Sequence, residues 1–184
     1  MSSTSRGAER RNLDAYYTPD DVAQRLVSLL PIACGAIVLE PSVGGGAFAR
    51  ALHPVADNVW GMDINEDAPG LNECTSSRVG DFFDMHLLEC EQRPMWIVGN
   101  PPFTGAEEHA RHALSITGRH VAFLLRLAFL ESATRAPFWT AHPPRRVWVF
   151  SKRPSFTGGK TDSCAYGFFW WDREYRGEPA LGWV

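Results

Sequence analysis

Short, continuous apolar runs alternate with amphipathic segments along most of the chain. The apolar runs cover residues 36–39, 58–64, 95–98, 120–126, 146–150 and 164–171, and a further strand is expected to end near Val79. Continuous apolar runs of this length are typical of strands that are buried on both faces. The segments 19–30, 105–117 and 128–139 carry apolar residues at helical spacing. This alternation of strand and helix predicts an α/β fold with a mostly parallel sheet.

The last two predicted strands are joined by a polar loop, residues 151–163, that contains no helical pattern. Strands joined in this way pair antiparallel, because a parallel pair needs a long crossover. We therefore expect a seven-stranded sheet, mostly parallel with an antiparallel last strand, and helices on both faces. Residues 16–184 are expected to form one domain, and the Ser- and Arg-rich residues 1–15 a disordered lead-in.

The first predicted helix has a clear start signal. Thr18 is expected to cap it with its hydroxyl, with Pro19 at the first helical position and Asp20 in the first turn. Capping explains the Thr-Pro pair, but it does not explain the two tyrosines that precede it, Tyr16 and Tyr17.

The overall composition is that of a soluble globular protein. The chain has 184 residues, of which 45% are hydrophobic and 21% are charged. It has no apolar run of membrane-spanning length and no secretory signal, so we expect a cytoplasmic protein without membrane contact. The four cysteines and the histidines His109, His112 and His120 show no metal-ligand pattern, so reduced thiols and no metal site are expected.

Charge is distributed unevenly along the chain. The net charge is −3, but residues 1–110 hold 7 Lys/Arg against 16 Asp/Glu, whereas residues 111–184 hold 11 against 5. Residues 145–160 contain five bases and no acidic residue. The bases are Arg145, Arg146, Lys152, Arg153 and Lys160. This pattern fits either a surface for a polyanion or a solvated basic loop.

A glycine-rich turn follows the first strand and favours a nucleotide-bearing ligand. Glu40-Pro41 leads into Gly44-Gly45-Gly46, and the second strand ends at Asp63. Glycines let the backbone approach a ligand, and an acid at the second strand tip can bind ribose hydroxyls. The same spacing fits the dinucleotide fingerprint of an NAD site, so the glycines alone do not decide between cofactors.

Two acidic side chains favour S-adenosylmethionine over NAD. Glu40 lies at the first strand tip, where it would repel a pyrophosphate but attract an ammonium group. At the third tip, Asp81 can accept a hydrogen bond from an adenine amino group and Phe82 can pack on its ring. Sites for ammonium, ribose and adenine together describe S-adenosylmethionine.

The fourth predicted strand stops at a rigid corner, Asn100-Pro101-Pro102-Phe103. Two prolines cannot continue a sheet or enter a helix. The Asn100 amide oxygen and the Pro101 carbonyl can accept both hydrogens of one exocyclic amino group, and Phe103 can stack on the ring that carries it. An ordinary strand-end turn has the same residue types, so the corner alone does not establish the chemistry.

Taken in order, these motifs resemble those of gamma-class N6-adenine DNA methyltransferases, which use S-adenosylmethionine. They are Tyr17-Thr18-Pro19, Glu40-Pro41 with its glycines, Asp63, Asp81-Phe82 and Asn100-Pro101-Pro102-Phe103. The resemblance covers nearly the whole chain and implies a Rossmann-like methyltransferase fold. It also implies direct transfer of the methyl group to the N6 atom of an adenine flipped out of DNA.

The resemblance assigns expected roles to individual residues. The cofactor contacts would be Tyr17, Thr18, Glu40, Pro41, Gly44, Gly46, Asp63, Ile64, Asp81, Phe82 and Asn100. The catalytic corner would be Asn100, Pro101, Pro102 and Phe103, and Phe156 would close over the other face of the base. The expected substrate contacts are Phe103, Arg145, Arg146, Lys152, Arg153, Phe156 and Lys160.

Several alternatives remain open at this point. Gamma-class enzymes usually carry a separate target-recognition domain, whereas this chain ends soon after its last predicted strand. We therefore expect a promiscuous enzyme, a very short recognition site, or help from a separate specificity subunit or a homodimer; small stand-alone phage and prophage enzymes are similar. The corner also resembles that of methyltransferases for RNA bases or protein glutamine, and a non-catalytic partner subunit with this fold is a further alternative.

Overall fold

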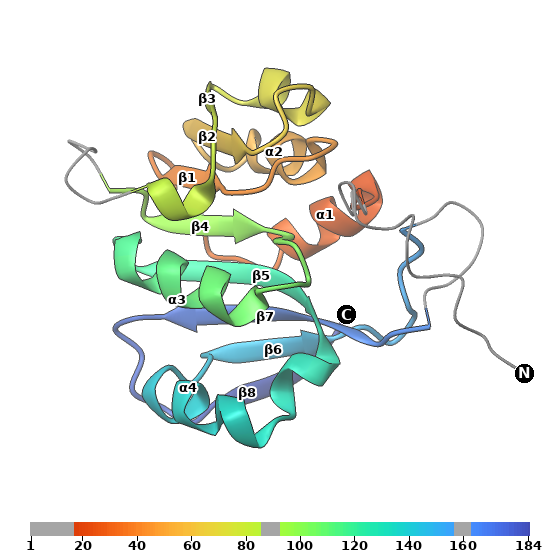
Figure 1. Cartoon of the computed structure of the whole chain (residues 1–184), viewed down its shortest axis with the longest axis vertical. Coiled ribbons are helices and arrows are strands. Elements are labelled where there is room, and N and C mark those ends of the chain that lie inside the picture. The colour runs from red at the N-terminus through yellow and green to blue at the C-terminus, as the bar shows by residue number, and fades with distance from the viewer. Residues whose placement is uncertain (1–16, 86–92, 157–162) are drawn as a thin grey trace, which may run out of the picture.

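The computed structural model describes residues 17–85, 93–156 and 163–184. Helices and strands alternate along the chain, as the apolar pattern predicts (Figure 1). In order they are α1 (Asp20–Val27), β1 (Ile37–Glu40), α2 (Ala47–Leu52), β2 (Asn58–Asp63), β3 (Ser76–Val79), β4 (Trp96–Gly99), α3 (Ala106–Ile116), β5 (His120–Arg126), α4 (Ala136–Ala141), β6 (Arg146–Val149), β7 (Tyr166–Asp172) and β8 (Ala180–Trp183). Short 3-10 helices occupy Pro69–Glu73, Phe82–Asp84, Leu127–Leu130 and Ala133–Arg135.

The strands form one sheet in the order β3-β2-β1-β4-β5-β7-β6-β8. Strand β7 is antiparallel to both of its neighbours, and in Figure 1 its arrow points against those of β4 and β6. All other pairs are parallel, which confirms the predicted α/β architecture. No helix within the described ranges is long and apolar enough to cross a membrane.

The sheet has eight strands rather than the predicted seven. The additional strand, β8, pairs parallel with β6 at the edge of the sheet. Its exposed Leu181 and Trp183 alternate with half-buried Ala180 and Gly182. The segment that forms β8 is also apolar, but the strand is only four residues long and contains a glycine, which weakens its strand signal.

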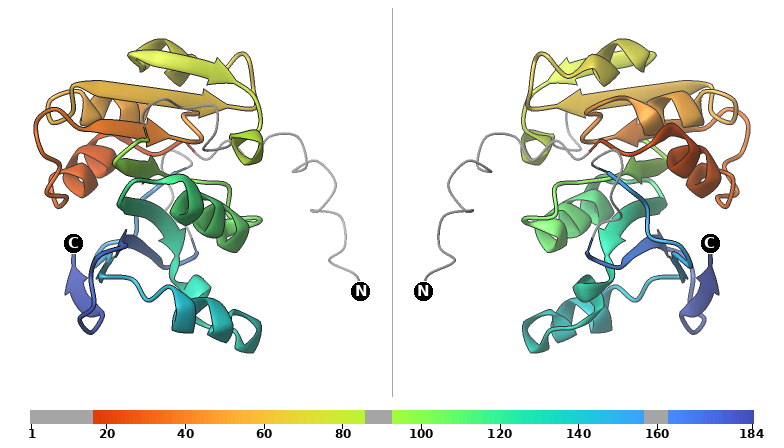
Figure 2. Two further views of the ribbon diagram at one scale, coloured as in Figure 1. Left: turned by 90° about the vertical axis from the view of Figure 1, so that its left-hand side faces the viewer. Right: turned by 90° about the vertical axis from the view of Figure 1, so that its right-hand side faces the viewer.

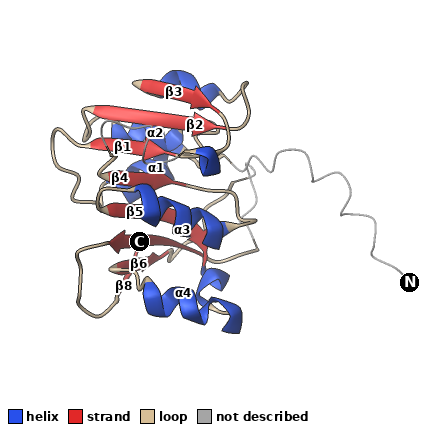
Figure 3. Cartoon of the chain, turned by 60° about the vertical axis from the view of Figure 1, so that its left-hand side comes forward, coloured by secondary structure: helices blue, strands red, loops and turns tan. Residues whose placement is uncertain are grey.

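The sheet separates two apolar cores. On β5, Val121, Phe123 and Leu125 face the layer of α3 and α4, whereas Ala122 and Leu124 face the layer of α1 and α2. Helices therefore cover both faces of the sheet (Figures 2 and 3). Because alternate side chains of β5 are buried on opposite faces, the strand has a continuous apolar sequence.

The predicted helix over residues 128–139 is wrong. Two 3-10 helices, Leu127–Leu130 and Ala133–Arg135, precede the short helix α4. Pro137 lies in the first turn of α4, the place in a helix where proline is tolerated, because it removes a backbone donor and clashes with the preceding turn elsewhere. The proline therefore marks the start of a helix rather than its interior.

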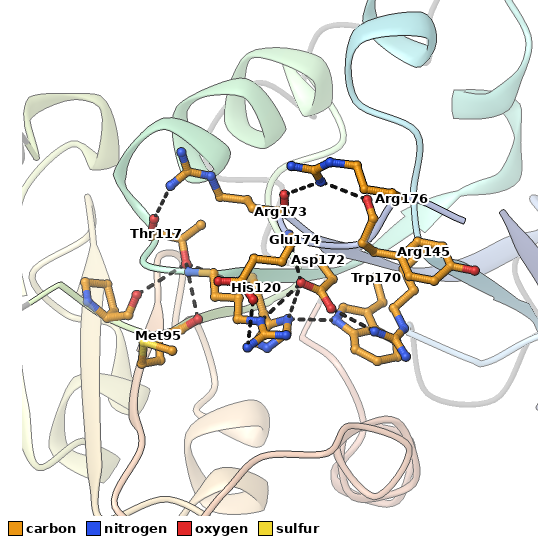
Figure 4. A network of polar contacts seen from close by, with 12 residues as sticks. Met95, Thr117, His120, Arg145, Trp170, Asp172, Arg173, Glu174 and Arg176 are labelled. Carbon is orange, nitrogen blue, oxygen red and sulfur yellow. Dashed lines mark hydrogen bonds and ion pairs between the residues drawn. The ribbon is translucent and has the colours of Figure 1, made fainter. Parts of the chain in front are cut away.

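A network of polar contacts lies at the amino end of β5 (Figure 4). The Asp172 carboxylate, 1% exposed, pairs with the guanidinium groups of Arg119 at 3.2 Å and Arg145 at 2.8 Å. His120 lies 3.8 Å from Asp172, and the Trp170 indole donates a hydrogen bond of 3.4 Å to its Nδ1 atom. These contacts tie the starts of β5 and β6 to the end of β7.

Burial and charge shift two ionisation equilibria in this network. Burial lowers the pKa of His120 to about 4, so the imidazole is neutral near pH 7. Burial alone would raise the pKa of Asp172. Hydrogen bonds from the Glu174 backbone, Arg119 and Arg145 outweigh that effect and lower it, so the carboxylate stays ionised.

Acidification should destabilise the fold between about pH 6.5 and pH 4. In this window the histidine of the unfolded chain, with its ordinary pKa of 6.5, binds a proton that folded His120 does not bind. The free energy of unfolding should therefore fall as pH falls, by up to about 1.4 kcal/mol per pH unit. Measured by urea denaturation across this window, the free energy of unfolding should depend less steeply on pH in His120→Gln than in the wild type. The matched variant His53→Gln should keep the wild-type slope; equal slopes in all three proteins would contradict the role of His120.

Candidate functional site

The candidate site lies where the carboxyl ends of the parallel strands meet, in a cavity of about 330 Å³. The cavity brings together most of the predicted residues: Tyr17, Pro41, Gly44, Asp63, Ile64, Asp81, Phe82, Asn100, Pro101, Pro102 and Phe103. A smaller cavity of about 30 Å³ lies against Thr18, Glu40 and Asn100. Parallel pairing explains this gathering, because polar residues that follow parallel strands are carried to the same edge of the sheet.

The glycine turn between β1 and α2 is shaped by close backbone contacts. Gly44 and Gly46 have φ values of 47° and 79°, in the left-handed region that favours glycine. A Cβ atom on Gly46 would lie 2.8 Å from the Cα atom of Gly70. The Gly70 N–H donates to the Gly44 carbonyl at 2.9 Å, so the two loops are held together at the wall of the cavity.

The Asp63 carboxylate is held at the tip of β2 by two backbone donors. The Gly44 N–H donates to Oδ2 at 2.8 Å, and the Asn65 N–H donates to Oδ1 at 2.9 Å. A carboxylate has about four lone-pair positions, so it can still accept hydrogen bonds from a pair of hydroxyl groups. The two contacts orient Asp63 and join the first two strand tips.

Two buried oxygen atoms at the site have no hydrogen-bond partner within the described part of the chain: Glu40 Oε2 and Asn100 Oδ1. Glu40 is only 2% exposed, and its burial, with a contribution from the charge of Asp63, raises its pKa well above the usual value. An unpartnered buried acceptor is unfavourable by about 1–3 kcal/mol. Both atoms are therefore suited to accept hydrogen bonds from a ligand.

The third strand tip forms an aromatic wall. Phe82 is buried and packs against the His109 ring at a centroid distance of 6.0 Å. Asp81 accepts a hydrogen bond of 3.0 Å from the Phe83 N–H, and Phe83 itself contacts His109 at 4.7 Å. The carboxylate is thus fixed beside two aromatic rings.

Six further residues line the larger cavity without having been predicted: Ser42, Asn65, Ala68, Gly80, Phe83 and His109. Phe83 directly follows the predicted pair Asp81-Phe82, and this adjacency could have identified it. His109 was considered in the sequence only as a metal ligand and was given no role; it reaches the cavity because α3 packs beside the loop that follows β3. No local sequence signal reports that contact, and the described residues contain no group suited to a metal ion.

The predicted target side of the cleft is also aromatic. The Arg126 guanidinium lies over the Phe103 ring at 4.4 Å. Phe103 packs on Tyr166 at 5.6 Å, and Phe156 packs on Tyr166 at 4.9 Å. The two rings that the sequence assigns to opposite faces of a base are therefore both placed beside Tyr166 in this structure.

The residues of the predicted basic surface lie at opposite ends of β6. Lys152 and Arg153 follow the carboxyl end of β6 and are exposed at the edge where the site lies. Arg145 and Arg146 lie at the amino end of β6, at the opposite edge, and Arg145 is engaged by Asp172. Arg145 and Arg146 therefore lie away from the cleft, because β6 separates residues that are close in sequence. Lys160 lies outside the described residues.

Comparison with known proteins supports this reading of the fold. No protein-family model matches the sequence. The structure is similar to that of a candidate class I S-adenosylmethionine-dependent methyltransferase from Listeria monocytogenes, with a TM-score of 0.72 and 11% identity over 95% of this chain and 68% of that one. The fold is the Rossmann-like methyltransferase fold.

Two further structures have the same fold and are described by different roles. A candidate RNA methyltransferase from Pyrococcus horikoshii has a TM-score of 0.67 and 16% identity, covering 88% of this chain and 91% of that one. A modification subunit of a candidate type I restriction enzyme from Vibrio vulnificus YJ016 also has a TM-score of 0.67 and 16% identity, over 91% of this chain. The chain spans 46% of that subunit, less than half its length.

Gly46→Ala should destabilise the protein more than Gly35→Ala. Both glycines have left-handed φ values, 79° and 85°, so an alanine should cost about 1–2 kcal/mol of strain at either position. At Gly35 nothing lies within 4 Å of the added methyl group, whereas at Gly46 the Gly70 backbone does. Overpacking should therefore cost a further ~1–3 kcal/mol at Gly46. Urea denaturation measures both; equal losses would show that the turn can open to accept a side chain.

Proposed function

We propose that this protein transfers a methyl group from S-adenosylmethionine to the N6 amino group of adenine in DNA. The observation that carries the proposal is the Asn100 amide, whose Oδ1 atom is buried at the cleft without a hydrogen-bond partner in the described chain. The Pro101 carbonyl follows Asn100 directly in the chain, and the next residue, Pro102, has no backbone N–H beside that oxygen. Together the two oxygens suit an exocyclic amino group with two hydrogens.

The residues around the two cavities fit S-adenosylmethionine. Glu40 would bind the methionine ammonium group, Asp63 the ribose hydroxyls, and Asp81 with Phe82 the adenine. A volume of about 330 Å³ is within the range of small-molecule sites. When bound, the cofactor would supply a methyl group on a sulfonium sulfur: the amine nitrogen would form the new bond to carbon, the sulfur–carbon bond would break, and the amine proton would be lost to water.

The protein's own contribution to the reaction is orientation. The adenine N6 lone pair is delocalised into the ring and is a poor nucleophile. Acceptors on both amino hydrogens favour a more pyramidal nitrogen, with its lone pair directed at the methyl group, so no covalent nucleophile is needed. A base within a duplex cannot reach this corner, so the target would be flipped out, with Phe103 stacked on it and Phe156 closing over its other face.

Two further observations support the proposal: the first favours a nucleic acid over protein, and the second favours DNA. Lys152 and Arg153 are exposed at the same edge of the sheet as the cleft, where they can contact phosphates. The fold is also shared with a modification subunit of a restriction enzyme, and recognition through a separate specificity subunit or a second copy belongs to this proposal. The similarity to a candidate RNA methyltransferase makes RNA the second candidate.

Methyl-labelled S-adenosylmethionine should label DNA, with the label recovered as N6-methyladenine. The test uses duplex DNA, single-stranded DNA, RNA and bulk protein in separate reactions. Label in RNA or protein would keep the chemistry and replace the substrate. Cofactor binding without label in any reaction would contradict the proposed activity of the isolated chain.

In the same assay Asn100→Ala should lower turnover by at least ~100-fold, because the orienting acceptor is lost. Its dissociation constant for S-adenosylmethionine should change much less, whereas Asp63→Ala should weaken cofactor binding. Asn58→Ala, at the amino end of β2, is the matched control and should behave like the wild type. Full activity in Asn100→Ala would rule out the proposed mechanism.

Cofactor affinity should rise with pH through Glu40. Burial raises the pKa of this carboxyl group, which favours its protonated form in the free protein, whereas an ammonium ligand would favour its ionised form. At pH values above 4.5, the ordinary carboxyl pKa, binding should release up to one proton, and the dissociation constant should fall as pH rises, by up to about tenfold per pH unit. Calorimetry across this range measures the effect. Glu40→Gln should bind more weakly and lose the pH dependence; a wild-type affinity that is flat with pH would contradict this role.

A further inference from the structure

Thr18 has the sequence position of a helix cap but does not act as one. Helix α1 begins at Asp20 without any side-chain cap, and the Ala23 N–H donates to the Pro19 carbonyl at 3.0 Å. A threonine in this sequence context would ordinarily accept a hydrogen bond from the first turn. The structure directs its hydroxyl elsewhere, so the capping prediction is wrong.

The hydroxyl contacts the catalytic corner instead. Asn100 Nδ2 donates to Thr18 Oγ1 at 3.2 Å, across 82 residues of sequence. The start of α1 therefore lies beside the end of β4 (Figure 1). The oxygen and nitrogen of a planar amide point in different directions, so engaging Nδ2 determines where Oδ1 is presented.

Glu40 offers the amide nitrogen a competing partner. Its Oε2 atom is buried without a hydrogen-bond partner in the described chain, and Glu40, Thr18 and Asn100 line the same small cavity. A buried carboxyl oxygen gains free energy from any N–H that turns toward it. If Nδ2 turned to Glu40, the amide would rotate and Oδ1 would no longer be presented as it is now.

We propose that Thr18 is a positioning residue whose hydroxyl holds the Asn100 amide with Oδ1 available to the target amino group. That the oriented Oδ1 atom accepts a hydrogen bond from the target amino group rests on the proposed methyltransferase function. The hydrogen bond between Thr18 and Asn100 does not, and it can be measured in the protein without substrate. Thr18 thus acts on the acceptor side of the reaction, beyond its expected contact with the cofactor.

Two substitutions at Thr18 separate the hydroxyl from the rest of the side chain. Thr18→Val is nearly isosteric and removes the hydroxyl, whereas Thr18→Ser keeps it. Thr18→Val should lower kcat by roughly 10- to 100-fold, because a hydrogen bond and the geometry it sets are lost. Its dissociation constant for S-adenosylmethionine should change by a smaller factor than kcat does, because the lost hydrogen bond acts on the Asn100 acceptor. Thr18→Ser should restore most of kcat, and Thr140→Val, on the exposed side of α4, should leave it unchanged.

A second measurement examines the hydrogen bond without activity. The side-chain NH2 signals of Asn100, assigned by their loss in Asn100→Asp, should shift in the NMR spectrum of Thr18→Val and stay in place in Thr18→Ser. Unchanged signals in Thr18→Val, or a weakened cofactor affinity with normal kcat, would overturn the inference. If the wild type transfers no methyl group, the proposed function fails, and the NMR comparison still decides whether Thr18 holds Asn100.

Discussion

Parallel pairing of the strands is the constraint on which the candidate site depends. Strands β3, β2, β1, β4 and β5 run in one direction, so the polar residues that follow them are carried to a single edge. Glu40, Asp63, Asp81 and Asn100 are separated in the sequence by complete strands and helices, yet all four border two adjacent cavities. The apolar interior of the sheet fixes this geometry, because its side chains are packed on both faces.

Buried polar groups have different surroundings at the two ends of the parallel strands. At the amino ends, Asp172 is fully engaged by two arginines and a backbone donor, which stabilises a closed network. At the carboxyl ends, Glu40 Oε2 and Asn100 Oδ1 are buried without partners in the described chain. Leaving such atoms unsatisfied reduces the stability of the fold, and proteins concentrate this kind of cost at functional sites.

The distribution of charge in the sequence has a different meaning in three dimensions. The bases between Arg145 and Lys160 are continuous along the chain, but β6 runs through the segment and carries its two halves to opposite edges. Arg145 serves the network around Asp172, whereas Lys152 and Arg153 lie on the side of the cleft. Of the four bases that the structure describes in this segment, only Lys152 and Arg153 are placed to contact a polyanionic substrate at the proposed site.

The sequence by itself determined the architecture and the strand-tip residues, because both depend on local patterns. Each of Glu40, Asp63 and Asn100 directly ends or follows an apolar run, so a strand and its tip could be read together. The tertiary structure alone decided the place of β8, the partner of the Thr18 hydroxyl and the entry of His109 into the cavity. These depend on contacts between segments far apart in the chain, and neither hydrophobic period nor turn chemistry specifies which distant atoms will meet.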